Sequence, residues 1–121
     1  MDKKKFQKEL AKAKRFTDPT LIKRNVKTVI DAKKDSDTAL PRGYRNLVIA
    51  NEECGELIQE VSKVLRGKED HFGLLQELAD VQIGIYAIQE VCGISNEELE
   101  RAVNVKMDHA LKEVRKNGMY K

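Results

Sequence analysis

The chain has 121 residues, of which 40% are hydrophobic, 36% are charged and only 5% are aromatic, with no tryptophan. This length allows one domain with a single modest core, and the lack of β-branched and aromatic runs favours a helical bundle over a sheet protein. The apolar runs are too short to cross a membrane and no basic-then-apolar leader is recognisable, so we expect a cytoplasmic protein.

Charge is segregated along the chain, although the net charge is only +3. Residues 1–45 hold 14 Lys/Arg against 6 Asp/Glu, residues 46–100 hold 3 against 12, and residues 101–121 hold 6 against 2. An acidic centre between basic ends suits a metal-binding core beside groups that receive a polyanion. Basic ends would equally suit contact with nucleic acid.

Helical spacing of the apolar residues predicts five helices, at residues 2–16, 19–34, 44–65 and 71–91 and from the Ser95 capping box to about Asn117. The first is amphipathic and rich in lysine, and its charged side is expected to face solvent. Asp18 is the expected N-cap of the second helix and Pro19 its first residue, whereas Gly67 and Gly93 end the third and the fourth. Ser95 opens a capping box that begins the fifth helix.

The polar segment of residues 35–43, which ends in Pro-Arg-Gly, is the clearest linker in the chain. It separates a basic N-terminal helical section, residues 1–43, from the remainder, residues 44–121. The first section is too short to bury a core of its own. We therefore expect a single domain in which the N-terminal section packs on a bundle formed by residues 44–121.

The fourth helix is apolar around most of its circumference, which is typical of a central or interface helix. Gly84 within it costs about 1 kcal/mol relative to alanine, which indicates close approach of another helix or a ligand. The apolar side of the fifth helix is expected to face the bundle and includes Val103 and Met107. Cys54 and Cys92 form no C-x-x-C motif and are expected to be small core residues in a reducing compartment.

Two carboxylate pairs stand out in the third and fourth helices. Glu53 and Glu56 lie three residues apart, as do Glu77 and Asp80, so each pair shares one helix face. None of the four has a Lys or Arg three or four residues away. Because like charges at this spacing are destabilising, antiparallel packing of the two helices would create a cluster that requires a cation.

The ligand types indicate a hard divalent cation, Mg²⁺ with Mn²⁺ as the alternative. A di-iron bundle would need Glu-x-x-His on two helices, but the residue three positions before His71 is Lys68, and before His109 it is Lys106. Both histidines are expected at the surface, which also disfavours zinc.

The run Glu52-Glu53-x-x-Glu56, followed after a gap of twenty residues by Glu77-x-x-Asp80, resembles the E-E-x-x-E…E-x-x-D signature of the MazG-like superfamily of all-α nucleoside triphosphate pyrophosphohydrolases. The resemblance covers roughly residues 47–115. It implies an all-α MazG-like helical bundle of about five helices that assembles as a dimer or tetramer. It also implies Mg²⁺-dependent hydrolysis of a (d)NTP to the monophosphate and pyrophosphate.

The resemblance also implies roles for individual residues of the two acidic helices. Glu53, Glu56, Glu77 and Asp80 are the expected metal ligands, and Glu53 is also a catalytic candidate. Glu52 lies about 100° around the helix from Glu53, and as the second catalytic candidate it would orient a lysine or a water, or act as a base.

The resemblance further implies that basic and amide side chains of the last helix lie near the phosphates, which makes Asn104, Lys106 and Arg115 the substrate-binding candidates, with Lys106 and Arg115 for the triphosphate tail. Two alternative functions remain open at this point. One is hydrolysis of phosphoribosyl-ATP within the same class of enzyme. The other is a non-catalytic helical oligomer whose lysine-rich N-terminal region binds nucleic acid. We favour the enzyme, with a nucleoside triphosphate and further copies of the chain as partners and with no membrane or nucleic-acid partner.

Overall fold

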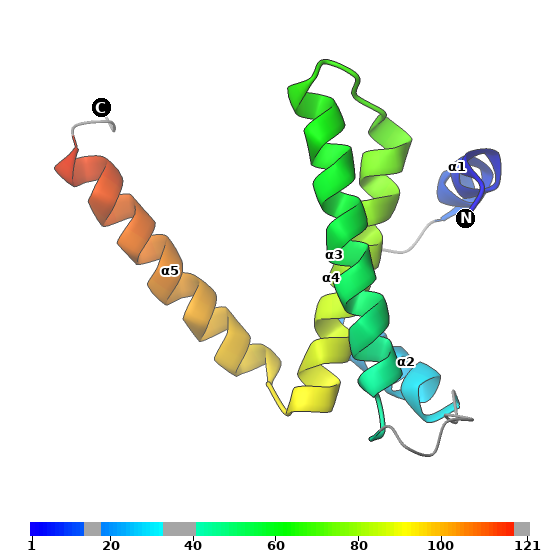
Figure 1. The fold of residues 1–121 in the computed structure, drawn as a ribbon. Coiled ribbons are helices and arrows are strands. Elements are labelled where there is room, and N and C mark those ends of the chain that lie inside the picture. The colour runs from blue at the N-terminus through cyan, green and yellow to red at the C-terminus, as the bar shows by residue number, and fades with distance from the viewer. Residues whose placement is uncertain (14–17, 33–40, 118–121) are drawn as a thin grey trace.

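The computed structural model describes residues 1–13, 18–32 and 41–117, and these residues form five helices and no strand (Figure 1). The helices are α1 (Lys3–Lys12), α2 (Pro19–Ala32), α3 (Tyr44–Leu65), α4 (His71–Cys92) and α5 (Asn96–Lys116). The all-α class and the presence of the five helices are therefore confirmed. The first helix is shorter than predicted, because it ends at Lys12 and Ala13 is already extended. Residues 14–16 and 33–34, the remaining expected ends of the first two helices, lie outside the described residues.

The helices α3 and α4 form a long antiparallel pair at the centre of the fold (Figure 1). The chain reverses through Gly67, whose φ of 71° places it in the left-handed region that glycine adopts without strain. The side chain of Asp70 then caps α4 by accepting a hydrogen bond of 3.1 Å from the Gly73 N–H. These local signals fix the two helices side by side.

The helices α3 and α4 approach closely at Gly84 and Ala50, both of which are buried. A Cβ atom placed on Gly84 would lie 3.1 Å from the Cβ and 3.4 Å from the Cα of Ala50. The sequence predicted close approach of another helix or of a ligand at this position, and the contact shows that a helix approaches. The absence of a side chain at residue 84 allows the two backbones to approach.

A small core forms where α2 crosses α4. Val26 and Ile30 of α2 and Ala87 of α4 are buried together, and Tyr86 and Val91 of α4 pack against them. The more distant α1 contacts the N-terminal end of α4, where an ion pair joins Lys3 to Asp70. Contacts with α1, α2 and α3 make α4 the central helix, as its apolar circumference predicted.

The last helix, α5, diverges from the α3–α4 pair instead of packing along it (Figure 1). Its N-terminus is well defined, because the Ser95 side chain accepts a hydrogen bond of 3.1 Å from the Glu98 N–H. Val103 and Met107, predicted to face the bundle, are 52% and 56% exposed. The prediction that they face the bundle is therefore wrong for a single chain. The apolar pattern identifies which face of the helix is apolar, but it does not identify the surface that would cover this face.

Other apolar positions of the described residues are also open to solvent. Cys54 and Cys92 are both exposed, so their prediction as core residues is wrong for the single chain. Ile58 and Leu65 of α3 are 67% and 83% exposed. None of the helices in the described ranges has the length and apolar character that a bilayer span requires.

Candidate metal centre

Acidic side chains of α3 and α4 meet on the facing sides of the central helix pair. One carboxylate oxygen from each of Glu53, Glu56 and Glu77 lies within 4.8 Å of the other two. The i, i+3 spacing places the first two on one face of α3, and the antiparallel neighbour α4 brings the third to them. This is the convergence that the spacing predicted for these three residues.

The carboxylates differ in how far water can reach them. Glu53 and Glu77 are half-buried, whereas Glu56 is exposed. The Oε2 atoms of Glu53 and Glu77 are buried and have no hydrogen-bond partner among the described residues. A buried polar atom without a partner costs roughly 1–3 kcal/mol, and more when it is charged. Two such oxygens on facing helices fit a cation as their missing partner.

The pKa values of these side chains show the same unfavourable electrostatics. Burial, together with the adjacent Glu53 and Glu56 carboxylates, raises the pKa of Glu77 from its ordinary value of 4.5 to about 7. Burial also raises the pKa of Glu53, and the negative charges of Asp80 and Glu56 add to the effect. A bound cation would favour the ionised form of both Glu53 and Glu77 and so oppose these shifts.

Asp80 lies beside the group of three without joining it. It is exposed, and it lines a cavity of about 150 Å³ together with Glu53, Ala50 and Gly84. Its charge is close enough to contribute to the raised pKa of Glu53. Of the four predicted metal ligands, three have oxygens in mutual reach and the fourth borders the adjoining cavity.

The other predicted site residues lie outside this cluster. Glu52 is exposed on α3 and is not part of the group of three. Asn104, Lys106 and Arg115 are exposed along α5, and a single chain does not bring them to the carboxylates because α5 diverges from the helix pair (Figure 1).

Glu60 lies one turn beyond Glu56 on α3 and differs from the clustered acids in having a cationic neighbour. Its Oε1 accepts a hydrogen bond of 2.8 Å from the Lys63 ammonium group, three residues further on. Its Oε2 is buried without a hydrogen-bond partner among the described residues, as are those of Glu53 and Glu77. The ion pair with Lys63 is therefore the feature that distinguishes Glu60 from the clustered carboxylates.

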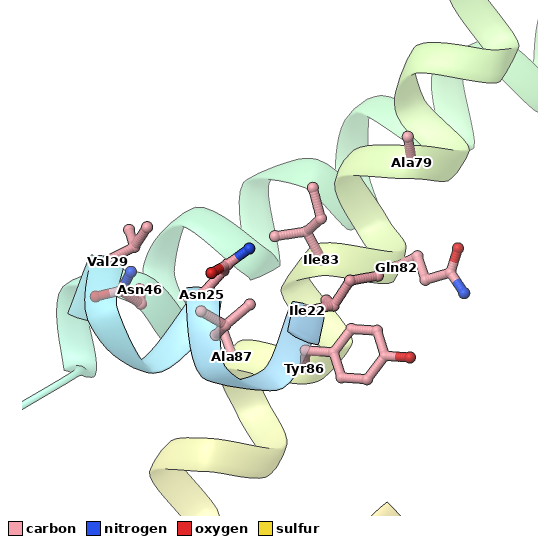
Figure 2. A pocket seen from close by; sticks show the side chains of 10 residues that line it. Ile22, Asn25, Val29, Asn46, Ala79, Gln82, Ile83, Tyr86 and Ala87 are labelled. Atoms are coloured by element: carbon pink, nitrogen blue, oxygen red, sulfur yellow. The ribbon is translucent and has the colours of Figure 1, made fainter. Parts of the chain in front are cut away.

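Sequence reasoning missed a larger cavity of about 380 Å³ between α2, α3 and α4 (Figure 2). Its lining combines aliphatic side chains with the amides of Asn25, Asn46 and Gln82 and with Tyr86. A signal was available in α2, where Asn25 lies three residues after Ile22 on the apolar stripe of the helix. An amide on an apolar stripe indicates either a buried hydrogen bond or a polar group that lines a cavity.

Comparison of the chain with protein-family models, with curated proteins and with solved structures finds no match. Three clustered carboxylates, two of which have a buried oxygen without a hydrogen-bond partner in the described part of the chain, form a ligand set that fits a hard, oxygen-seeking divalent cation such as Mg²⁺ or Mn²⁺.

Proposed function

We propose that the protein is a Mg²⁺-dependent nucleoside triphosphate pyrophosphohydrolase of the MazG-like type, which converts a (d)NTP to its monophosphate and pyrophosphate. The observation that carries the proposal is the convergence of Glu53, Glu56 and Glu77, two of them half-buried, with pKa values raised at Glu53 and Glu77. A bound divalent cation would offset the repulsion among these carboxylates and favour their ionised forms. The signature spacing of the same residues supports the choice of enzyme class.

The proposed roles follow from where each carboxylate lies. Glu53, Glu56 and Glu77 would hold the ion, with Asp80 at the border of the adjoining cavity. A bound Mg²⁺ would supply positive charge to phosphate oxygens, which stabilises the negative charge of phosphoryl transfer. Glu52, exposed beside these ligands, is available to orient the attacking water or to accept its proton.

We also propose that the protein works as a homo-oligomer, a dimer or a tetramer. Ile58 and Leu65 on α3 and Val105 on α5 are 67%, 83% and 64% exposed, and apolar surface of this extent is typical of interfaces. Assembly would also allow Lys106 and Arg115 on the diverging α5 to reach the carboxylates of a neighbouring copy and bind the triphosphate tail there.

The oligomer proposal is tested by light scattering over a range of protein concentrations. We expect wild type to exceed the monomer mass, and Ile58→Lys and Val105→Lys to reduce it because a charge cannot be buried at an apolar interface. Gln59→Lys places the same charge on an exposed polar position of α3 and should leave the mass unchanged. A wild-type protein that stays monomeric at all micromolar concentrations would refute the proposal.

The catalytic proposal is tested by measuring pyrophosphate release from a panel of canonical and modified (d)NTPs, with phosphoribosyl-ATP included. Release should require Mg²⁺ and stop with EDTA. Glu53→Gln should lower it by more than about 100-fold, because the partners of a metal ligand alone contribute about 10–100-fold. Glu113→Gln, an exposed carboxylate on α5, is the matched control and should retain full activity. No release from any compound would refute the proposal.

A further inference from the structure

The largest cavity described above adjoins the smaller cavity beside the candidate metal centre. Val29, Asn46 and Ile83 line both this cavity and the smaller one that Glu53 and Asp80 border. A molecule that fills both would have one end among amides and aliphatic side chains and the other end at the carboxylates. A nucleotide fits this arrangement, with its base in the larger cavity and its phosphates near the carboxylates that border the smaller one.

The lining of the larger cavity suits a flat heterocycle. Its volume of about 380 Å³ falls within the range of roughly 300–1,000 Å³ usual for small-molecule sites. Ile22, Val26 and Ile83 supply aliphatic surface for the faces of a ring. The side chains of Asn25 and Asn46 supply donors and acceptors for its polar edge, since each amide carries two N–H donors and a carbonyl acceptor.

The amides are distributed unevenly around the cavity. Figure 2 shows the side-chain amides of Asn25 and Asn46 at the end of the cavity near Val29, while the tips of Gln82 and Tyr86 extend at the opposite end. Asn46 also lines the smaller cavity, so the amide-rich end is the one that adjoins the metal centre. Val29 and Ile83 are about half exposed, which leaves the cavity open to an entering ligand.

We infer that this cavity receives the nucleobase of the substrate and that Asn25 and Asn46 select among bases through their side-chain amides. The inference rests on the proposed function, because it assigns the second half of the same substrate. Tyr86 is the only aromatic residue that the described part of the chain contributes to this lining, so aliphatic side chains would contact the faces of the base and the amides would bind its polar edge.

The test compares the binding of nucleotides with that of a phosphate chain that has no base. Titration calorimetry with Mg²⁺ measures the affinities of α,β-methylene analogues of the four dNTPs, which resist hydrolysis, and of inorganic tripolyphosphate. Asn25→Leu removes the amide at similar volume, and Asn25→Asp exchanges its donors for acceptors. Gln59→Leu makes the equivalent change on the exposed face of α3, away from the cavity.

We expect Asn25→Leu to weaken the preferred analogue by about tenfold, the usual effect of losing one hydrogen bond in a binding site. Asn25→Asp should alter the ranking of the four bases, since it inverts part of the hydrogen-bonding pattern. Tripolyphosphate affinity should stay within about twofold in both variants, and Gln59→Leu should match wild type throughout.

Two results overturn the inference and separate it from the proposed function. If tripolyphosphate binds with Mg²⁺ but the Asn25 variants leave the ranking of bases unchanged, or weaken all ligands equally, the base site is refuted while the phosphate site stands. If neither tripolyphosphate nor any analogue binds in the presence of Mg²⁺, the proposed function fails and the base site fails with it.

Discussion

Replacement of Glu77 by glutamine should stabilise the protein at neutral pH when no divalent cation is present. In the folded state, burial and the adjacent Glu53 and Glu56 raise the pKa of Glu77 from 4.5 to about 7. Below pH 4.5 the carboxyl group is protonated in both folded and unfolded chains, and above pH 7 it is ionised in both. The unfolding free energy of wild type should therefore fall as pH rises through this window.

The magnitude follows from the size of the pKa change. At about 1.4 kcal/mol for each pH unit, the full change corresponds to an upper limit of about 3 kcal/mol. Water reaches this half-buried site and screens part of the repulsion, so we expect Glu77→Gln to exceed wild type by about 1–2 kcal/mol at pH 8. At pH 4 the difference should vanish, because both side chains are then neutral.

Urea unfolding in EDTA, at one protein concentration and at pH 4 and pH 8, measures these differences. Saturating Mg²⁺ should reverse the order at pH 8, since a cation at about 100 times its dissociation constant stabilises the folded state by about 2.7 kcal/mol. Glu52→Gln, an exposed carboxylate on α3, is the control and should shift stability by less than about 0.5 kcal/mol. Equal stability of wild type and Glu77→Gln at pH 8 in EDTA would refute the electrostatic reasoning.

Three further predictions concern the helices that carry the site. Gly84→Val should lower the unfolding free energy by about 1–3 kcal/mol and weaken Mg²⁺ binding in calorimetry, because the new side chain would press against Ala50. A Cβ atom on Gly55 would have no neighbour within 4 Å in the described ranges, so Gly55→Ala should instead raise the unfolding free energy by up to about 1 kcal/mol. Equal effects of the two substitutions would contradict the role of helix spacing. Gly43→Ala should cost more than about 1 kcal/mol in urea unfolding, because its φ is 83° and its Cβ would overlap Val91, and a neutral result would contradict this packing. Ser95→Ala should cost about 1 kcal/mol and increase amide exchange in the first turn of α5, and unchanged exchange there would show that the cap is dispensable.

The central helix pair and the clustering of three of the four predicted carboxylates were predictable because their signals are local. Helical periodicity and Gly67 indicate α3 and α4, and antiparallel pairing is the simplest consequence of so short a connection. The absence of a Lys or Arg three or four residues away then marked the clustered carboxylates in the sequence, whereas the structure pairs Glu60 with Lys63. Each of these inferences depends on residues within a few positions of one another.

The features that sequence reasoning missed depend on contacts between distant parts of the chain. The cavity joins residues of three helices, and no spacing rule places Asn25 opposite Ile83. The course of α5 is a second case, because an apolar stripe on Val103 and Met107 indicates burial without naming the surface that provides it. Asp80 differs from Glu77 for a related reason, since small rotations of a helix decide which carboxylate faces inward.

The close contact between Ala50 and Gly84 also has a consequence for the choice of ion. Because neither residue has a side chain that can yield, this contact acts as a spacer that sets the distance between the two rows of carboxylates. Mg²⁺ requires oxygens at about 2.0–2.1 Å, whereas Ca²⁺ accepts about 2.3–2.6 Å and more ligands. In the proposed centre, selectivity for the smaller ion would thus be encoded by two uncharged residues that never touch it.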